Sequence, residues 1–396
     1  APLLREGRRF VLAFGRQWAF NGSVPGPLPD GEPAPRDGGL PPGSLDSFDA
    51  SRGMSWYVHV PFCRTRCGYC DFNTYTALEL AGSSSVAQST FAEHLGAEVD
   101  LARDVLGDRR VPVSTVFVGG GTPTLITPDA LGSVLARIDS GFGLADGAEV
   151  TLEANPDSVD RTSLRRLREV GFTRISFGMQ SAVPHVLAVL DRTHTPGGAL
   201  QAVADARAAG FEQISLDLIY GTPGESLSDW QHTLDVAIDL APDHVSAYAL
   251  IVEDGTRLAR RVARGEIAAP DDDLMAAMYE AADDRLAGAG FAWYEISNWA
   301  RSPAHRSRHN EHYWVDADWW GVGPGAHSHI GGVRWWNVKH PAAWASRLAG
   351  GQSPAAAREL LDEPSRRLER IKLGLRTVPG LSLINISEPT RRSEVS

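Results

Sequence analysis

The sequence predicts an α/β fold, a partial (β/α)6 barrel followed by a smaller C-terminal α+β domain. Six short runs rich in β-branched residues alternate with helical segments between residues 56 and 250, which favours parallel strands joined by right-handed crossovers. Six strands are too few to close an eight-stranded barrel. The only three cysteines of the 396 residues follow the first strand, and glycine-rich or polar segments follow later strands.

Each predicted element has a local signal in the sequence. The helices are expected where apolar residues recur every three or four positions, and Thr127 with Pro128 marks a helix start, as Gly210 marks an end. The expected strands are 56–60, 114–118, 149–153, 174–177, 213–219 and 244–250. The expected helices between them are 91–106, 128–138, 161–170, 196–209 and 227–240. Two further helices are expected at 271–289 and 366–375.

Composition limits the class of protein. The chain is 43% hydrophobic and 22% charged, which is ordinary for a soluble globular protein with a large core. Its formal net charge of −11 argues against a nucleic-acid partner held through bulk charge. No run of 18 apolar residues is present, so no membrane-spanning segment is expected. Three clustered cysteines fit the reducing cytoplasm, where we expect the protein to reside.

Four segments are expected along the chain. Residues 1–53, crowded with Pro, Gly and Asp between 22 and 42, predict a disordered N-terminal arm. Residues 54–258 form the barrel, and 259–380 form the C-terminal domain, which we expect to be incomplete. The chain begins with Ala1 instead of Met, and we interpret 1–23 as translated upstream sequence. The polar, aperiodic stretch 381–396 is interpreted as a non-native tail.

The cysteine loop carries the strongest chemical signal. Cys63, Cys67 and Cys70 have C-x3-C-x2-C spacing, and thiolates are preferred ligands of iron–sulfur clusters. Three cysteines on a four-iron cubane leave one iron open, and the amino and carboxylate groups of S-adenosylmethionine (SAM) can chelate it. A Cys3His zinc site that includes His59 is the alternative. An odd number of crowded cysteines disfavours a disulfide framework.

This loop resembles that of the radical SAM superfamily, including the aromatic Tyr69 just before the last cysteine. The string YVHVPFC at 57–63 narrows the resemblance to the family of oxygen-independent coproporphyrinogen III dehydrogenases and HemW-type heme chaperones. The resemblance covers roughly residues 27–380. It implies a [4Fe-4S] cluster held by Cys63, Cys67 and Cys70, with SAM as the second cofactor.

Polar signals fall at the ends of the strands, where such barrels hold their chemistry. The segment GGGTP at 119–123 follows the second strand and lets a ligand approach the backbone closely, since glycine has no Cβ. By resemblance, the positions that contact SAM are Tyr57, Gly120, Gly121, Thr122, Glu153, Gln180, Arg192, Asp217 and Ala249. Some family members bind a second SAM, whose matching set is Tyr69, Gly121, Thr122, Gln180, Arg192, Asp217 and Ala249. Whether one or two SAM molecules bind stays open.

The region 293–344 combines aromatic and imidazole side chains. It holds eight of the eleven tryptophans, and 305–340 holds six of the twelve histidines. Such residues suit a porphyrin, which needs flat apolar walls and an axial ligand for iron. HNEHYW at 309–314 resembles the HNxxYW motif of HemW-type chaperones, as do YEISNW at 294–299 and GVGPGAHS at 321–328. We therefore predict heme contacts by His309 and His312; the alternative is a tryptophan-rich core with histidines capping its turns.

One position separates carrier from enzyme. The dehydrogenases carry a fourth cysteine two residues after the third, where this chain has Phe72. We therefore expect a heme chaperone without catalytic residues that passes heme to apo-cytochromes or other recipients at the membrane, with a reductant protein as partner. The alternative is a coproporphyrinogen III dehydrogenase, which decarboxylates its substrate oxidatively to protoporphyrinogen IX by radical SAM chemistry. A zinc-binding barrel of other function is the third hypothesis.

Overall fold

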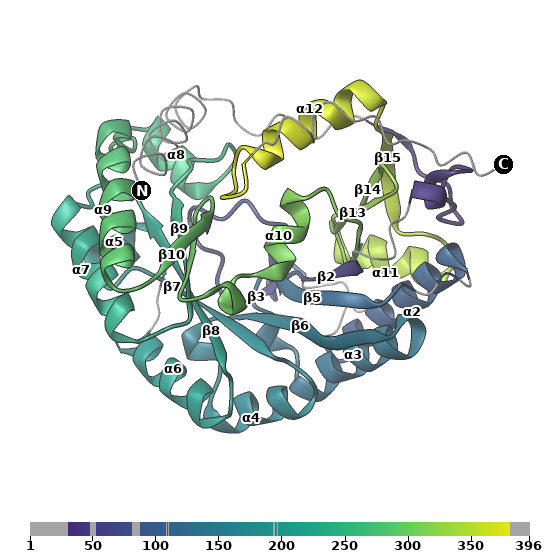
Figure 1. Cartoon of the computed structure of the whole chain (residues 1–396), viewed down its shortest axis with the longest axis horizontal. Helices are drawn as coiled ribbons and strands as arrows, with labels where there is room; N and C mark the ends of the chain where they lie inside the picture. The colour runs from purple at the N-terminus through teal and green to yellow at the C-terminus, as the bar shows by residue number, and fades with distance from the viewer. Residues whose placement is uncertain are drawn as a thin grey trace.

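A computed structural model describes residues 31–47, 53–80, 88–107, 109, 111–192, 195 and 197–380. Six parallel strands form the centre of the molecule, each hydrogen-bonded to the next in chain order. They are β2 (Met54–Val60), β5 (Val113–Gly120), β6 (Leu144–Ala154), β7 (Arg174–Gln180), β8 (Gln213–Tyr220) and β9 (His244–Ala249). The predicted six-stranded parallel core is confirmed, and its sheet is curved but not closed (Figure 1).

Helices cover the outer side of the curved core sheet (Figure 1). They are α2 (Gln88–Leu106), α3 (Pro128–Phe142), α4 (Arg161–Glu169), α6 (Gly198–Ala208) and α7 (Leu227–Asp239). The N-cap signal at Thr127 acts as expected, since its side chain accepts a hydrogen bond from the Ala130 N–H. Ser226, which the sequence analysis did not single out, caps α7 in a capping box with Asp229. The sequence analysis missed α5 (Pro184–Val189), whose six residues are too few to show a helical period.

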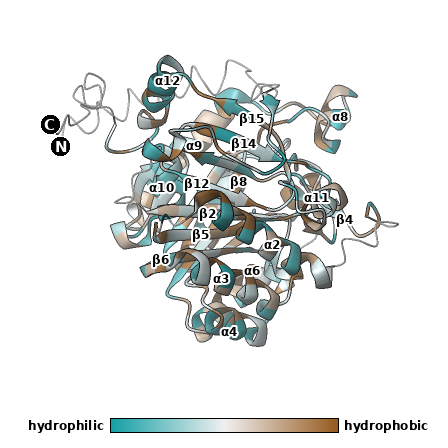
Figure 2. Ribbon diagram, turned by 90° about the vertical axis from the view of Figure 1, so that its right-hand side faces the viewer, coloured by the Kyte–Doolittle hydropathy of each residue, from teal (hydrophilic) through white to brown (hydrophobic). Residues whose placement is uncertain are grey.

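The two faces of the core sheet differ in burial. On β2, Trp56, Val58 and Val60 point to the outer helices and are fully buried. Burying a large apolar side chain contributes about 1.5–3 kcal/mol, so this alternation fixes the register of the strand against the helices. Figure 2 shows apolar colouring concentrated on these central strands, whereas α4 at the periphery is largely hydrophilic.

Residues beyond 258 extend this sheet at both edges. At one edge, β11 (Asn298–Ala300) pairs antiparallel with β9, and β10 (Ala292–Glu295) follows it. At the other edge, β12 (Trp319–Val322) pairs parallel with β2 and is followed by antiparallel β13 (His327–Ile330), β14 (Val333–Asn337) and β15 (Ala355–Leu360). These C-terminal strands therefore share one thirteen-stranded sheet with the core.

The remaining helices lie around and within this sheet. They are α8 (Arg257–Ala263), α9 (Asp272–Gly288), α10 (Arg308–Trp314), α11 (Pro341–Ala349) and α12 (Glu363–Gly374). Helix α12 runs from β15 towards β10 across the open side of the sheet (Figure 1), and Arg334 of β14 holds Glu369 of α12 at 3.0 Å. Shortly after α12 in the chain, Thr377 forms an antiparallel bridge with Glu295. The last described segment thus connects the two edges of the sheet.

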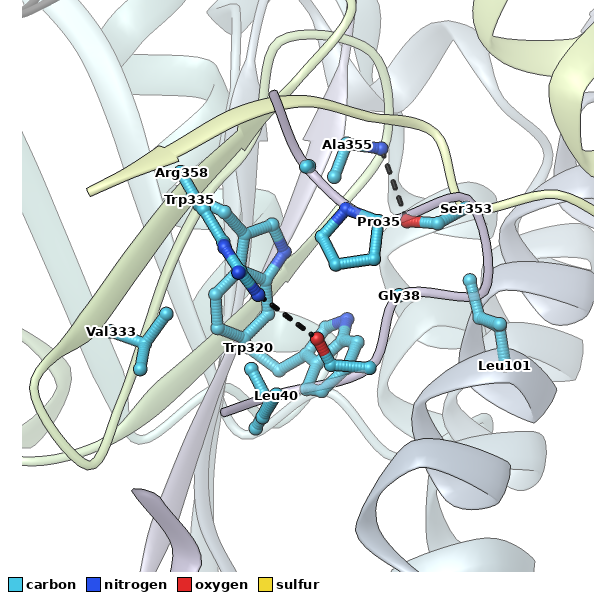
Figure 3. Close-up of a pocket in the computed structure, with 12 residues that line it drawn as sticks. Pro35, Gly38, Leu40, Leu101, Trp320, Val333, Trp335, Ser353, Ala355 and Arg358 are labelled. Carbon is cyan, nitrogen blue, oxygen red and sulfur yellow. Dashed lines mark hydrogen bonds between the residues drawn. The ribbon is translucent and has the colours of Figure 1, made fainter. Parts of the chain in front are cut away.

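The expected N-terminal arm lies partly outside the described residues. Its described part, residues 31–47, is ordered against the sheet: β1 (Glu32–Pro33) pairs antiparallel with β15, and Arg358 ion-pairs with Glu32 at 2.6 Å. A small pocket there is lined by Trp320 and Trp335 from the outer face of the sheet, with Arg358 donating a hydrogen bond to the Gly39 carbonyl (Figure 3). Composition alone did not reveal this strand because it has only two residues. The expected upstream segment 1–23 and tail 381–396 also lie outside the described residues.

In the part of the chain that the structure describes, no helix combines the length and the apolar character that a membrane crossing requires.

Buried Glu98 of α2 joins the core to the C-terminal strands. Its carboxylate accepts hydrogen bonds from the Gly323 N–H at 2.8 Å, the Asn337 amide at 2.6 Å and the Trp344 indole at 2.7 Å. Burial raises the pKa of Glu98 to about 7, against the effect of these three donors. One side chain thus satisfies three buried donors that come from β12, β14 and α11 or their flanking loops.

Glu98→Ala should lower the free energy of unfolding by about 3 kcal/mol or more, because three buried donors lose their acceptor. Chemical denaturation of the two proteins measures the difference. Glu98→Gln should lose less, since one acceptor oxygen remains, and Glu93→Ala on the exposed side of α2 is the matched control. Equal stability of Glu98→Ala and the control would contradict this assignment.

Candidate functional site

The inner face of the sheet borders a partly open interior. Four side chains point away from the outer helices, and each keeps partial exposure while its chain neighbours are buried. They are Tyr57 on β2, Phe117 on β5, Glu153 on β6 and Asp217 on β8. Tyr248 on β9 is 44% exposed. Side chains from five strands therefore converge on one accessible space, as the end-of-strand rule predicts.

The cysteine loop begins where β2 ends. Cys63 closes the short strand β3 (Phe62–Cys63), which pairs with β4 (Tyr75–Thr76), and Cys67 and Cys70 lie in the loop between them. All three thiols are free. The loop is fixed at Gly68, whose N–H donates to the Leu190 carbonyl at 3.2 Å and whose carbonyl accepts from the Leu258 N–H at 2.8 Å.

The GGGTP segment is joined to this loop through its backbone. The Gly121 N–H donates to the Val60 carbonyl and the Thr122 N–H to the Phe62 carbonyl, both at 2.7 Å. A Cβ at Gly121 would lie 2.5 Å from the Phe62 oxygen and 3.0 Å from the Cys63 sulfur. Position 121 therefore requires glycine if the loop and the turn are to pack together.

Burial disfavours the ionised form of two thiols of this loop. Burial raises the pKa of Cys63 to about 11, with Cys70 adding to the effect, and burial also raises the pKa of Cys70. Thiolates are the ligand form, so a bound metal centre must displace these protons. The Thr122 side chain, beside the Cys63 sulfur, acts in the opposite direction and favours its thiolate.

The donor set fits a cluster better than a single zinc ion. The two ring nitrogens of His59 hydrogen-bond with the Tyr57 hydroxyl at 3.0 Å and the Asn73 carbonyl at 2.9 Å, so neither is free for a metal. Tetrahedral zinc would need sulfur atoms about 3.8 Å apart. Among the described residues, no group of three His, Cys, Asp or Glu side chains is arranged to hold one metal ion. A larger cubane remains compatible with three thiols spread around one loop.

Two carboxylates face the interior beside the loop. Glu153 at the end of β6 accepts a hydrogen bond from the Gly120 N–H at 3.0 Å, and Asp217 on β8 accepts one from the Ser176 hydroxyl at 2.8 Å. Burial raises the pKa of Glu153 to about 7, and the charge of Asp217 adds to it. Burial likewise raises the pKa of Asp217. Such a pair favours a ligand that brings hydrogen-bond donors or positive charge.

Arg192 supplies a cation at the same end of the barrel. It donates a hydrogen bond to the Gly178 carbonyl at 3.5 Å, and its buried Nε has no partner among the described residues. Burial alone would lower the pKa of Arg192, but Tyr69 and Cys67 outweigh it and raise the pKa. Gln180, at a register shift in β7, has a φ of 64°. Unpaired polar atoms and strained backbone of this kind are typical of ligand sites.

The predicted SAM-contact positions thus lie on the inner face of the sheet or at the carboxyl ends of its strands, with Tyr57 and Asp217 inside β2 and β8. Burial raises the pKa of Tyr57, and the nearby Glu153 carboxylate raises it further. Ala249 ends β9 opposite Tyr220. Their roles towards SAM stay predictions, as do the cluster ligands.

The two histidines of the HNEHYW segment lie elsewhere, on α10 against the amino halves of β2 and β5. His309 is 1% exposed; its Nδ1 lies 2.9 Å from the Thr115 hydroxyl and its Nε2 3.0 Å from the Tyr313 hydroxyl. His312 Nδ1 lies 2.5 Å from the Ser55 hydroxyl, which also accepts from Thr115 at 2.9 Å. Burial lowers the pKa of His309 to about 3, so it is neutral. The heme contacts stay a prediction, and both ring nitrogens of His309 already have protein partners.

Sequence reasoning missed Glu149, which positions this helix. Its buried carboxylate accepts hydrogen bonds from the backbone N–H groups of Arg308 at 3.0 Å and His309 at 3.1 Å, at the N-terminus of α10. A signal existed in the alternation of Glu149, Thr151 and Glu153 along one face of β6. It could not be interpreted before the position of α10 was known.

The arrangement defines a radical SAM protein: a three-cysteine loop after the first strand of an open parallel barrel, with a glycine turn beside it. The family model described as radical SAM superfamily matches residues 57–237. A member of that superfamily uses SAM with a [4Fe-4S] cluster.

Comparison with curated proteins defines the family more narrowly. The chain is 51% identical over 335 residues to the heme chaperone HemW of Mycobacterium tuberculosis (strain H37Rv), covering 85% of this chain and 84% of that protein. It is 33% identical over 341 residues to the heme chaperone HemW of Bacillus subtilis, covering 86% and 87%. This chain belongs to the HemW family.

The fold is also that of a solved enzyme. Coproporphyrinogen III oxidase (HemN) from Escherichia coli, a radical SAM enzyme, matches with a TM-score of 0.73 and 22% identity, over 86% of this chain and 80% of that one. This likeness shows the fold alone.

Gly121→Ala should displace the cysteine loop, because the new methyl group would overlap the Phe62 carbonyl. We expect severalfold less iron and sulfide per chain after anaerobic reconstitution, measured by chemical analysis. Gly141→Ala on α3, where an added Cβ meets nothing within 4 Å, is the control and should match the wild type. Full cluster content in Gly121→Ala would show that the turn does not position the loop.

Proposed function

We propose that this chain is a heme chaperone, which binds heme and passes it to apo-hemoproteins. The observation that carries the proposal is the 51% identity, over most of both chains, to a protein named as a heme chaperone. Radical SAM members that act as enzymes share the same barrel, so the fold does not decide between carrier and enzyme.

The end of the cysteine loop favours the carrier. Phe72 stands where the dehydrogenases of the resembling family carry a fourth cysteine, and its side chain is 61% exposed. The chain has no other thiol that could replace it. An exposed phenylalanine two residues after Cys70 also offers apolar surface to a flat ligand.

The residues of the site suit the two cofactors. Cys63, Cys67 and Cys70 would hold the [4Fe-4S] cluster, which would supply an open iron for SAM to chelate and an electron source beside it. Glu153, with the backbone of 120–122, would accept hydrogen bonds from ribose hydroxyls or the amine of SAM. Arg192 and Asp217 would meet its carboxylate and its polar edge.

Binding of SAM should depend on pH through Glu153. An ionised carboxylate attracts the sulfonium cation and accepts hydrogen bonds through both oxygens, whereas a protonated one carries no charge and is a weaker acceptor. Because burial raises the Glu153 pKa to about 7, the affinity for SAM should fall as the pH decreases below about 7, by up to about tenfold per unit.

Calorimetric titration of the anaerobically reconstituted protein with SAM, at pH values from about one unit below that pKa to about one unit above it, measures this dependence. Glu153→Gln should bind SAM weakly and lose the pH dependence. Glu212→Gln, at an exposed position, should bind SAM with the affinity and the pH dependence of the wild type. A pH profile identical in wild type and Glu153→Gln would remove Glu153 from the SAM site.

The function itself is tested by offering both ligands to the same preparation. Reconstituted protein should bind heme stably, as followed by Soret absorbance, and should release it to an apo-cytochrome. With coproporphyrinogen III, SAM and a reductant it should form no protoporphyrinogen above the level of a protein-free control. Formation of protoporphyrinogen would support the dehydrogenase instead, and failure to bind heme would contradict the chaperone proposal.

A further inference from the structure

The end of the cysteine loop contacts two loops of the C-terminal strands. Asn73, three residues after Cys70, donates through its side-chain amide to the Pro324 carbonyl at 2.9 Å and to the Lys339 carbonyl at 2.8 Å. These acceptors follow β12 and β14 and lie 251 and 266 positions further along the chain. One side chain therefore joins the cofactor loop to the strands that extend the sheet.

The remaining polar groups of Asn73 bond to the core. Its backbone carbonyl lies 2.9 Å from His59 Nε2, and its side-chain oxygen accepts from the Tyr75 hydroxyl at 3.3 Å. Because a carbonyl can only accept, His59 carries its proton on Nε2 and accepts from the Tyr57 hydroxyl, at 3.0 Å, through Nδ1. Both amide hydrogens and both oxygens of Asn73 are thus engaged, and a reversed amide would place its oxygen against two carbonyl oxygens.

Two glycines form the other side of this contact. Gly323 has a φ of 107°, and an added Cβ would lie 2.5 Å from the His59 carbonyl oxygen. Gly325 has a φ of 75°, and an added Cβ would lie 2.7 Å from the Asn73 amide nitrogen. Only glycine combines such a backbone with so close an approach. The GVGPGAHS segment at 321–328 therefore brings bare backbone against the end of the cysteine loop.

The loop at 323–325 is itself held by buried groups. The Gly323 N–H donates to the Glu98 carboxylate at 2.8 Å, and the Asn337 amide donates to the Gly323 carbonyl at 2.8 Å. Glu98 and Asn337 are each about 1–2% exposed, so water does not compete for these bonds. Asn73 therefore bonds to a loop whose own position is fixed by the core.

A displacement of Asn73 is transmitted to Cys70 because the two residues are close in the chain. The Thr74 N–H donates to the Phe72 carbonyl at 2.7 Å, which closes a three-residue turn centred on Asn73. Three residues span at most about 10 Å even when extended. The glycine turn holds the start of the cysteine loop and Gly68 its middle, and Asn73 is placed to hold its Cys70 end.

We propose that Asn73 is a positioning residue of the cofactor site. Held against the loop at 323–325, it fixes the place of the Cys70 thiol relative to the glycine turn at 119–123, where SAM would bind. This inference rests on the proposed cluster and SAM site and is independent of heme transfer. It also gives the GVGPGAHS segment a role, since its glycines support the cofactor loop from the side of the C-terminal strands.

Asn73→Ala and Asn73→Asp in the full-length, anaerobically reconstituted protein test the assignment. Both variants keep the three thiols and should take up iron and sulfide as the wild type does. They should bind SAM on the order of tenfold more weakly, because two hydrogen bonds that place the loop are lost. The change that SAM causes in the electron paramagnetic resonance signal of the cluster should shrink in parallel.

The aspartate variant separates hydrogen bonding from shape. Aspartate has the size of asparagine but no amide hydrogens, so a purely steric role predicts that Asn73→Asp behaves as the wild type. Lys339→Ala is the matched control, because Asn73 bonds to the backbone carbonyl of this exposed residue, which the substitution retains. It should bind SAM with wild-type affinity.

A second measurement needs no cofactor. In the cluster-free protein, amide hydrogen exchange of residues 64–76 should be severalfold faster in Asn73→Ala, with exchange in β5 unchanged. Gly325→Ala should have the same effect from the opposite side of the contact. Gly351→Ala, with a φ of 66° and no atom within 4 Å of the added Cβ, should match the wild type.

The outcomes separate this inference from the proposed function. Wild-type SAM affinity and exchange in Asn73→Ala would overturn the role of Asn73 while leaving the cofactor site intact, as would wild-type behaviour of Asn73→Asp. Faster exchange throughout the chain would show a general structural role and would likewise overturn the positioning role. Absence of a cluster from the reconstituted wild type would overturn the proposed cofactor site, and this inference with it.

Discussion

The site depends on one backbone contact, between the glycine turn after β5 and the loop after β2. Two hydrogen bonds, from Gly121 to Val60 and from Thr122 to Phe62, hold these segments together, and the absence of a Cβ at position 121 lets them approach. Parallel pairing of β2 and β5 brings the two strand ends to the same level. Three thiols on one side and the carboxylate of Glu153 on the other therefore face the same space. Together with the hydrogen bonds of Gly68 to Leu190 and Leu258, this contact fixes the cysteine loop beside the glycine turn.

Much of the core was accessible from the sequence because its signals are local. The six strands, five of their helices and the cap at Thr127 follow from short-range patterns, and the cysteine spacing is a motif within one loop. The pairing of β12 with β2 joins residues more than 260 positions apart, and no local pattern indicates it. The expected C-terminal segment therefore proved to continue the core sheet, a relation that only the structure reveals.

The histidine-rich segment shows where pattern and geometry diverge. HNEHYW drew attention because histidine beside tyrosine and tryptophan suits a porphyrin, yet its first histidine is almost fully buried with both nitrogens bonded. GVGPGAHS contains an equally conspicuous histidine whose ring is exposed and unbonded among the described residues. Residue type was the same in both motifs, and the difference lies in burial and in the face of the sheet, which depend on the tertiary register. Glu149 escaped notice for the same reason, since its partner helix lies about 160 residues further along the chain.

The central claim is that three thiolates hold a cubane whose fourth iron is left for SAM. Mössbauer and electron paramagnetic resonance spectroscopy of the reduced, anaerobically prepared protein, with and without SAM, test it most directly. The account predicts a [4Fe-4S] cluster with one iron distinct from the other three, and a change in its signal when SAM is added. Zinc in place of iron and sulfide, or a cluster whose signal ignores SAM, would contradict it.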